Sequence, residues 1–178
     1  RRAVELDEAG VADQPTSPQR QRDLSTSNIQ LGYGLMRTGD SAGALAAYRS
    51  ALELREGLVR DDANDDQARR DLVSVLWYIG NLQNGTSYPL EAMPPLQRAL
   101  ALSPDGTYMS ALIRSGLADA LQNLGRLDET VQMRKQALDG FRVLLAKTPG
   151  AANVLQSIVR EQRVLGDSLM QFALQAPA

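Results

Sequence analysis

Side chains suited to catalysis are scarce in this sequence. It contains neither histidine nor cysteine, which removes the usual general base at neutral pH, thiolate nucleophiles and nearly all transition-metal ligand sets. Glu5, Glu53 and Glu56 are spaced as charges on helix faces rather than as an acid/base pair. Glycine loops of the GxGxxG or GxxxxGK type, which cradle phosphates, are absent. We therefore expect no catalytic residues, no cofactor and no metal site in this chain.

The acidic run at 61–66, DDANDD, is the densest set of oxygen ligands. It lacks the alternating ligand positions and the glycine of an EF-hand loop, which favours a solvated linker over a calcium site. The formal net charge of -2 gives no basic face for a nucleic-acid backbone. No apolar run approaches the roughly 20 residues of a membrane span. We expect neither nucleic acid nor membrane as a partner of this chain. We expect its location to be cytoplasmic.

The elements that carry these residues are helices. The hydrophobic fraction of 43% is sufficient for a core, and the aromatic fraction of only 4% leaves alanine and leucine dominant, which favours helix. Between Leu31 and Leu52, small residues alternate with large ones, so two helices can approach closely across a turn at Gly39-Asp40. This stretch predicts one helical hairpin.

The hairpin resembles the tetratricopeptide repeat (TPR), a unit of about 34 residues. Leu31-Gly32 matches the Leu-Gly of the first helix, and Ala44, Tyr48 and Ala51 match the small, aromatic and small residues of the second. A shift of 48 residues superposes Gly32 on Gly80 and RDL at 22–24 on RDL at 70–72. Constant helical phase with joints of variable length is typical of a stacked helical array.

The resemblance implies an all-α fold, a right-handed superhelix (solenoid) of antiparallel helical hairpins in a single domain over residues 1–178. We expect a partial second helix at 1–8, hairpins at 23–60, 71–102 and 107–147, and a terminal helix at 151–175. The terminal helix is either a cap over the apolar end of the array or the first half of another hairpin. Because the chain begins in what reads as the middle of a helix, we expect it to be excised from a larger protein.

Glycine, proline and N-cap residues predict where the helices end and begin. Glycine and prolines between 10 and 20 predict a loop, with Asp23 as the N-cap of the following helix. Asp71 is expected to start the third long helix. Pro94 and Pro95 lack amide hydrogens and clash with a preceding helical turn, so the helix near them is expected to begin there or to be kinked there.

In TPR proteins the first helices line a concave groove that binds peptides or extended segments of partner proteins. By repeat position, the expected partner-binding residues here are Ile29, Tyr33, Met36, Trp77, Asn81, Asn84, Ser115, Asp119, Gln122, Arg160 and Arg163. Tyr33 and Trp77 are the expected aromatic anchors. Asn81 can donate and accept hydrogen bonds with a peptide backbone.

Several of these positions have a competing structural role. The Trp77 ring is expected equally to lie in the core, and Arg160 and Arg163 form either an anion-friendly end of the groove or a solvated helix face. Some TPR proteins clamp a C-terminal carboxylate, but Ile29 and Tyr33 stand where that residue set starts and Gly116 replaces its arginine. We do not expect such a clamp here.

The resemblance thus implies a non-catalytic protein-interaction scaffold that binds a partner peptide or protein segment in its groove. The RDL lead-in, the GD turn and the long linkers also resemble repeats of bacterial multidomain proteins, including C-terminal regions attached to serine/threonine kinase domains. On that alternative interpretation this chain is the regulatory or sensory region of a kinase whose catalytic domain lies outside it. A third possibility is self-association through apolar ends of the solenoid.

Overall fold

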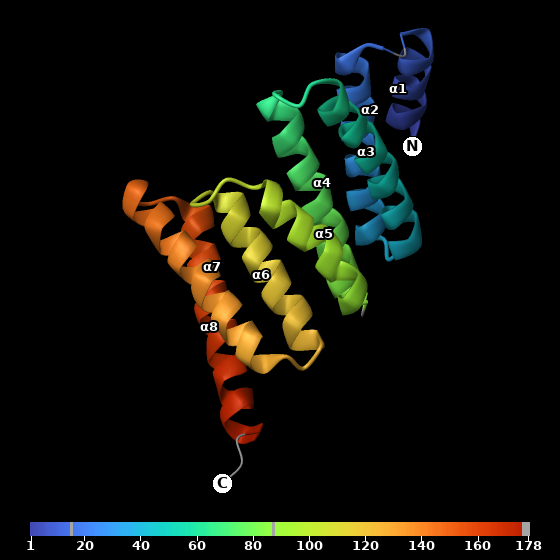
Figure 1. The fold of residues 1–178 in the computed structure, drawn as a ribbon. Coiled ribbons are helices and arrows are strands. Elements are labelled where there is room, and N and C mark those ends of the chain that lie inside the picture. The colour runs from blue at the N-terminus through green and yellow to red at the C-terminus, as the bar shows by residue number, and fades with distance from the viewer. Residues whose placement is uncertain (15, 87, 176–178) are drawn as a thin grey trace. The chain divides into compact units, whose positions relative to one another are not determined.

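Helices make up the whole of the regular structure in the residues that the computed structural model describes, 1–14, 16–86 and 88–175 (Figure 1). Their bounds are α1 (Arg2–Asp13), α2 (Pro18–Arg37), α3 (Ser41–Asp61), α4 (Asp66–Gly85), α5 (Pro89–Leu102), α6 (Tyr108–Asn123), α7 (Leu127–Lys147) and α8 (Ala152–Gln175). The predicted all-α fold is confirmed.

The chain divides into two compact units, Arg1–Leu82 and Gln83–Ala178. The first unit contains α1 to α3 and most of α4. The second contains the end of α4 and the four helices that follow. Each unit is described by itself below.

In the first unit, α2 and α3 form the antiparallel hairpin predicted around Leu31–Leu52. Gly39 takes a positive φ of 87° in the turn, a conformation that glycine adopts without strain. Asp40 caps α3, since its Oδ1 accepts a 2.8 Å hydrogen bond from the Gly43 amide. Tyr48 of α3 is buried directly against Gly32 of α2, so the small residue on one helix receives the ring of the other.

The joint between α1 and α2 is shorter than the predicted loop. α1 continues through Asp13, and α2 begins at Pro18 with Ser17 as its N-cap, not at Asp23. Proline suits the first helical position because the missing amide would be unpaired there. Pro15, one of the predicted loop breakers, lies outside the described residues.

The helix α4 begins five residues before the predicted Asp71. Its first turn is capped by Asp65, whose Oδ1 accepts hydrogen bonds from the amides of Gln67 and Ala68 at 2.8 and 3.0 Å. The hydrogen bond from Ala68, followed by the charge of Arg22, lowers the pKa of the Asp65 carboxyl. The acidic linker therefore shrinks to a short capped turn.

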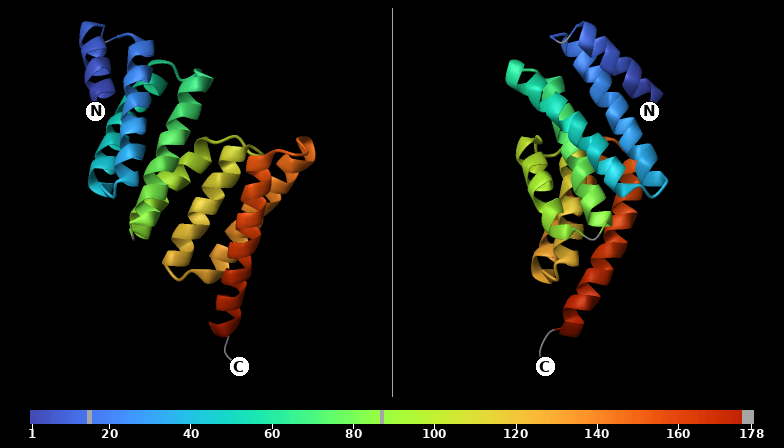
Figure 2. Two further views of the ribbon diagram at one scale, coloured as in Figure 1. Left: turned by 180° about the vertical axis from the view of Figure 1, so that it is seen from behind. Right: turned by 90° about the vertical axis from the view of Figure 1, so that its right-hand side faces the viewer.

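In the second unit, α6 and α7 form an antiparallel hairpin, and α8 packs against α7. Gly125 takes a φ of 73° in the hairpin turn. The core between these helices consists of Ala111, Ala137, Leu138, Phe141, Val154 and Ile158. The last turns of α8 extend beyond the turn that joins α6 to α7 (Figures 1 and 2).

The helix α5 begins at Pro89 and continues through Pro94 and Pro95. The predicted start at the proline pair is therefore wrong, while the alternative, a kink there, stays a prediction. The two missing amides would have bonded the carbonyls of Leu90 and Glu91, which both belong to exposed residues.

Candidate functional site

Three predicted groove residues, Ile29, Tyr33 and Met36, share one face of α2. Their spacing of four and three residues places their side chains next to one another. Tyr33 is 49% exposed and Met36 39% exposed, while Ile29 is half-buried beside them. We call these three residues the α2 face. It offers a large aromatic and a large flexible side chain to solvent on a helix whose other side is firmly packed.

Trp77 and Asn81 lie on α4, 48 residues after Ile29 and Tyr33 and so at the same repeat positions. The Trp77 ring is partly buried and packs edge-on against Tyr78 with 5.2 Å between ring centroids. Its Nε1 is buried and finds no acceptor among the described residues. Asn81 donates its side-chain amide to the Trp77 carbonyl at 2.9 Å. The Asn81 amide nitrogen is thus bonded within its own helix, and the Trp77 Nε1 is withdrawn from solvent.

Asn84 and Ser115, in the second unit, are engaged with helix backbone. Asn84 donates a 2.8 Å hydrogen bond to the Gly116 carbonyl, which ties the end of α4 to α6. Ser115 is buried and donates to the Ala111 carbonyl at 3.2 Å. The structure gives both residues a place in helix packing.

Asp119, Gln122 and Arg160 belong to a polar network that joins α6, α7 and α8. Arg134 of α7 donates to Asp119 Oδ1 and to Gln122 Oε1, each at 2.7 Å. Arg160 of α8 donates to the other oxygen of Asp119 at 3.1 Å. These predicted groove residues therefore hold three helices together. Arg163 is exposed, as is Arg160.

The centre of this network was not foreseen from the sequence. Arg134 stands 16 residues after Ala118, as Tyr48 stands 16 after Gly32, so it occupies the aromatic position of its hairpin. Its side chain is 1% exposed and pairs at 3.4 Å with Glu161, which is also 1% exposed. An arginine at an otherwise aromatic position was the available signal, because a buried cation requires a buried anion nearby.

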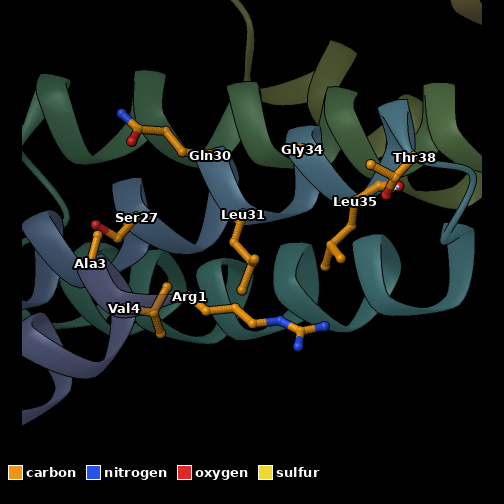
Figure 3. A pocket seen from close by; sticks show the side chains of 9 residues that line it. All are labelled: Arg1, Ala3, Val4, Ser27, Gln30, Leu31, Gly34, Leu35 and Thr38. Atoms are coloured by element: carbon orange, nitrogen blue, oxygen red, sulfur yellow. Dashed lines mark hydrogen bonds between the residues drawn. The ribbon is translucent and has the colours of Figure 1, made fainter.

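Each unit also carries an apolar pocket at the joint between a second helix and the next first helix. In the first unit a pocket of about 350 Å³ lies between α1 and α2, lined by Val4, Leu31 and Leu35 among others. Figure 3 shows Leu31 and Leu35 pointing toward the side on which Arg1 and Val4 lie. At its edge the Ser27 hydroxyl donates to the Asp7 carboxylate at 2.6 Å, and the Thr38 hydroxyl donates to the Leu35 carbonyl at 2.9 Å.

The pocket of the second unit occupies the equivalent place. It measures about 410 Å³ and is lined by Leu100 of α5 and by Leu117 and Leu121 of α6, which have the same spacing as Leu31 and Leu35. The charged residues in its lining, Arg126 and Glu129, pair with each other at 2.6 Å. Both pockets lie where neighbouring helices pack against each other.

Two further properties follow from the described residues. Among them, no group of three or more acidic side chains is arranged to hold a metal ion. None of the described helices has both the length and the apolarity that crossing a bilayer requires.

The geometry that decides the fold type is the contact between Gly32 and Tyr48 inside an antiparallel hairpin, with Leu-Gly on the first helix and Ala44, Tyr48 and Ala51 on the second. The fold is TPR-like. No family model matches the chain, and no curated protein matches it either.

Among solved structures, the chain is similar to the MamA RS-1 ArsTM double mutant, with 14% identity, a TM-score of 0.48 and coverage of 90% of this chain and 84% of that one. It is similar to MamA AMB-1 with 20% identity, a TM-score of 0.37 and coverage of 99% and 91%. YrrB, a TPR protein with an unusual peptide-binding site, shows 17% identity, a TM-score of 0.38 and coverage of 96% and 100%. With scores this low, the TPR-like fold rests on the hairpins of this chain itself.

Proposed function

We propose that this chain is a non-catalytic interaction scaffold and that the α2 face binds a segment of a partner protein. The observation that supports this most directly is the exposure of Tyr33 and Met36 side by side on a packed helix. Large aromatic side chains with few rotatable bonds tend to supply much of the energy at protein interfaces, and methionine adapts to irregular apolar surfaces.

The surroundings of the α2 face suggest the chemistry of the segment. Arg37 is exposed and lies one helical turn from Tyr33, on the same side of α2. A guanidinium beside an apolar patch favours a carboxylate on the ligand. The expected ligand is therefore a peptide with a bulky apolar side chain to cover Tyr33 and Met36 and an acidic residue next to it.

The regulatory region of a serine/threonine kinase stays a prediction. A reading frame that continues upstream into a glycine-rich loop and a His-Arg-Asp motif would support it. Peptide binding by the α2 face is compatible with a role as a kinase regulatory region, because such a region also acts by binding other protein segments.

The proposal is tested by selecting peptides from a displayed library on the full chain and measuring their affinity by calorimetry. We expect the Tyr33→Ala, Met36→Ala double variant to bind the selected peptides roughly 10- to 30-fold more weakly, since an interface anchor is worth about 2 kcal/mol. Tyr88→Ala is the matched control, because Tyr88 is a 59% exposed tyrosine that belongs to the second unit. Equal losses in both variants, or none in either, would contradict the proposal.

A further inference from the structure

The pocket of the second unit has the size of a ligand site. Its volume of about 410 Å³ lies in the range of about 300 to 1,000 Å³ that small-molecule pockets usually have. Three consecutive helices, α5, α6 and α7, contribute its lining. Protein interiors leave few voids larger than a water molecule. This space is therefore larger than ordinary helix packing leaves open.

The helices before and after α6 are both in place around this pocket. α5 precedes α6 in the chain, α7 follows it, and both contribute to the lining. The helical lining of the pocket in the first unit, by comparison, comes from α1 and α2. In a stacked array of hairpins each helix packs against its neighbours in the chain. The repeat pattern therefore supplies no further helix to fill the pocket of the second unit.

The apolar part of the lining combines fixed and adaptable side chains. Leu117 and Leu121 of α6 are each 3% exposed, so helix packing fixes their positions. Met93 of α5 and Met133 of α7 are half-buried. Methionine has three rotatable bonds and a polarisable sulfur, so it packs against apolar groups of different shapes. The pocket therefore suits a compact apolar body.

The polar part of the lining carries no net charge. Arg126 donates from Nε and Nη2 to the two carboxylate oxygens of Glu129, at 2.6 and 2.7 Å. A charged group on a ligand would be attracted by one member of this pair and repelled by the other. Gln97 adds a side-chain amide, which both donates and accepts hydrogen bonds. An uncharged group with a donor and an acceptor, such as an amide, complements these side chains.

We propose that the pocket of the second unit binds a small, uncharged amphipathic molecule that has an apolar body and an amide at one end. The body packs against Leu117, Leu121 and the two methionines, and the amide bonds the Arg126–Glu129 pair and Gln97. The α2 face belongs to the first unit, so this site does not depend on peptide binding there.

Methyl NMR of the full chain, labelled with ¹³C in the methionine methyl groups, tests the proposal with octanamide as the probe. The chain has five methionines, and Met93 and Met133 line this pocket. We expect their methyl resonances to shift saturably, with a Kd on the order of 1 mM or below. The resonances of Met36, Met109 and Met170 should stay in place.

Two charged probes of the same chain length test the choice of an uncharged end. Octanoate and octylammonium should each bind roughly fivefold more weakly than octanamide at pH 7. In Arg126→Gln the cation is gone and Glu129 stays, so octylammonium should become the tightest of the three probes. Arg126 makes no side-chain hydrogen bond that caps α7, so this variant keeps the start of the helix as it is.

Ala101→Phe fills the pocket from an exposed position of α5 that lines it. We expect octanamide to bind this variant about tenfold more weakly or not at all, because the ring takes the place of the apolar body. Ala146→Phe is the matched control, since Ala146 is exposed on α7 outside the lining. It should leave octanamide binding unchanged.

Three results would overturn the proposal: no saturable shift of Met93 and Met133, equal octanamide binding by the Ala101→Phe chain, or tighter binding of a charged probe by the wild-type chain. Shifts of the same two methionines by a library-selected peptide would overturn the assignment to a small molecule, because the pocket would then receive a protein segment.

Discussion

Tyr48 shows what one side chain contributes to this fold. Its ring lies against Gly32 and stacks on Tyr78 with 5.5 Å between centroids. Its hydroxyl is buried and has no hydrogen-bond partner among the described residues. Burial, followed by the nearby Tyr78 and Tyr33, raises the pKa of the Tyr48 hydroxyl from 10.0 to about 12. The ring therefore stabilises the hairpin, while the hydroxyl adds a desolvation cost.

This arrangement predicts the behaviour of Tyr48→Phe. At pH 7 its free energy of unfolding should equal that of the wild type or exceed it by up to about 1 kcal/mol, because an unpaired buried hydroxyl is removed and the ring stays. Because the folded pKa is raised, the contribution of neutral Tyr48 is complete below pH 10 and is lost as pH rises toward 12. Urea unfolding at intervals from pH 7 to 12 should show this alkaline loss in the wild type only. A difference between the two proteins that stays constant over that range would contradict the account.

At the level of helix packing, Arg134 of α7 takes the repeat position that Tyr48 holds in α3, so a charged side chain replaces an aromatic ring there. Arg134 and Glu161 are both buried, and with Asp119 and Gln122 they join α6, α7 and α8. Desolvating such charges is costly, so the network stabilises the three helices only while every partner is present. It positions α8 in the second unit.

We therefore expect Arg134→Met to lower the free energy of unfolding by about 3 to 5 kcal/mol, since Glu161 is left buried without its cation. Adding Glu161→Gln should recover part of that loss, because the unpaired charge is gone. Lys135→Met is the control, since Lys135 is the exposed neighbour on the same helix. Denaturant unfolding of the two single variants and the double variant gives the coupling energy. Purely additive losses would show that the pair acts independently and would refute the network.

The sequence predicted the structure correctly where the spacing of small residues determines how two helices pack. It predicted helix starts and side-chain contacts wrongly where residues distant in the repeat pattern determine them. The hairpin at Leu31–Leu52 was predictable because only small residues allow the approach of Tyr48 to Gly32. The starts of α2 and α4 were missed because Ser17 and Asp65 cap them earlier than the repeat register requires. The network around Arg134 was missed because its anions come from different helices, which repeat position alone cannot bring together.

For the molecule as a whole, the two compact units were not foreseen, because the 48-residue register that carries Ala51 to Ala99 crosses their boundary. Of the predicted groove, the structure leaves Ile29, Tyr33 and Met36 together on one exposed face and gives most other positions a role in packing. The central claim is accordingly that partner binding takes place on α2.

Hydrogen exchange of the full chain with and without a library-selected peptide tests that claim most directly. The account predicts added protection in the segment 29–37 of α2, with exchange elsewhere in the first unit nearly unchanged, and loss of this protection in the Tyr33→Ala, Met36→Ala variant. Protection that spares α2 and appears on other helices, at a peptide concentration that saturates binding, would contradict it.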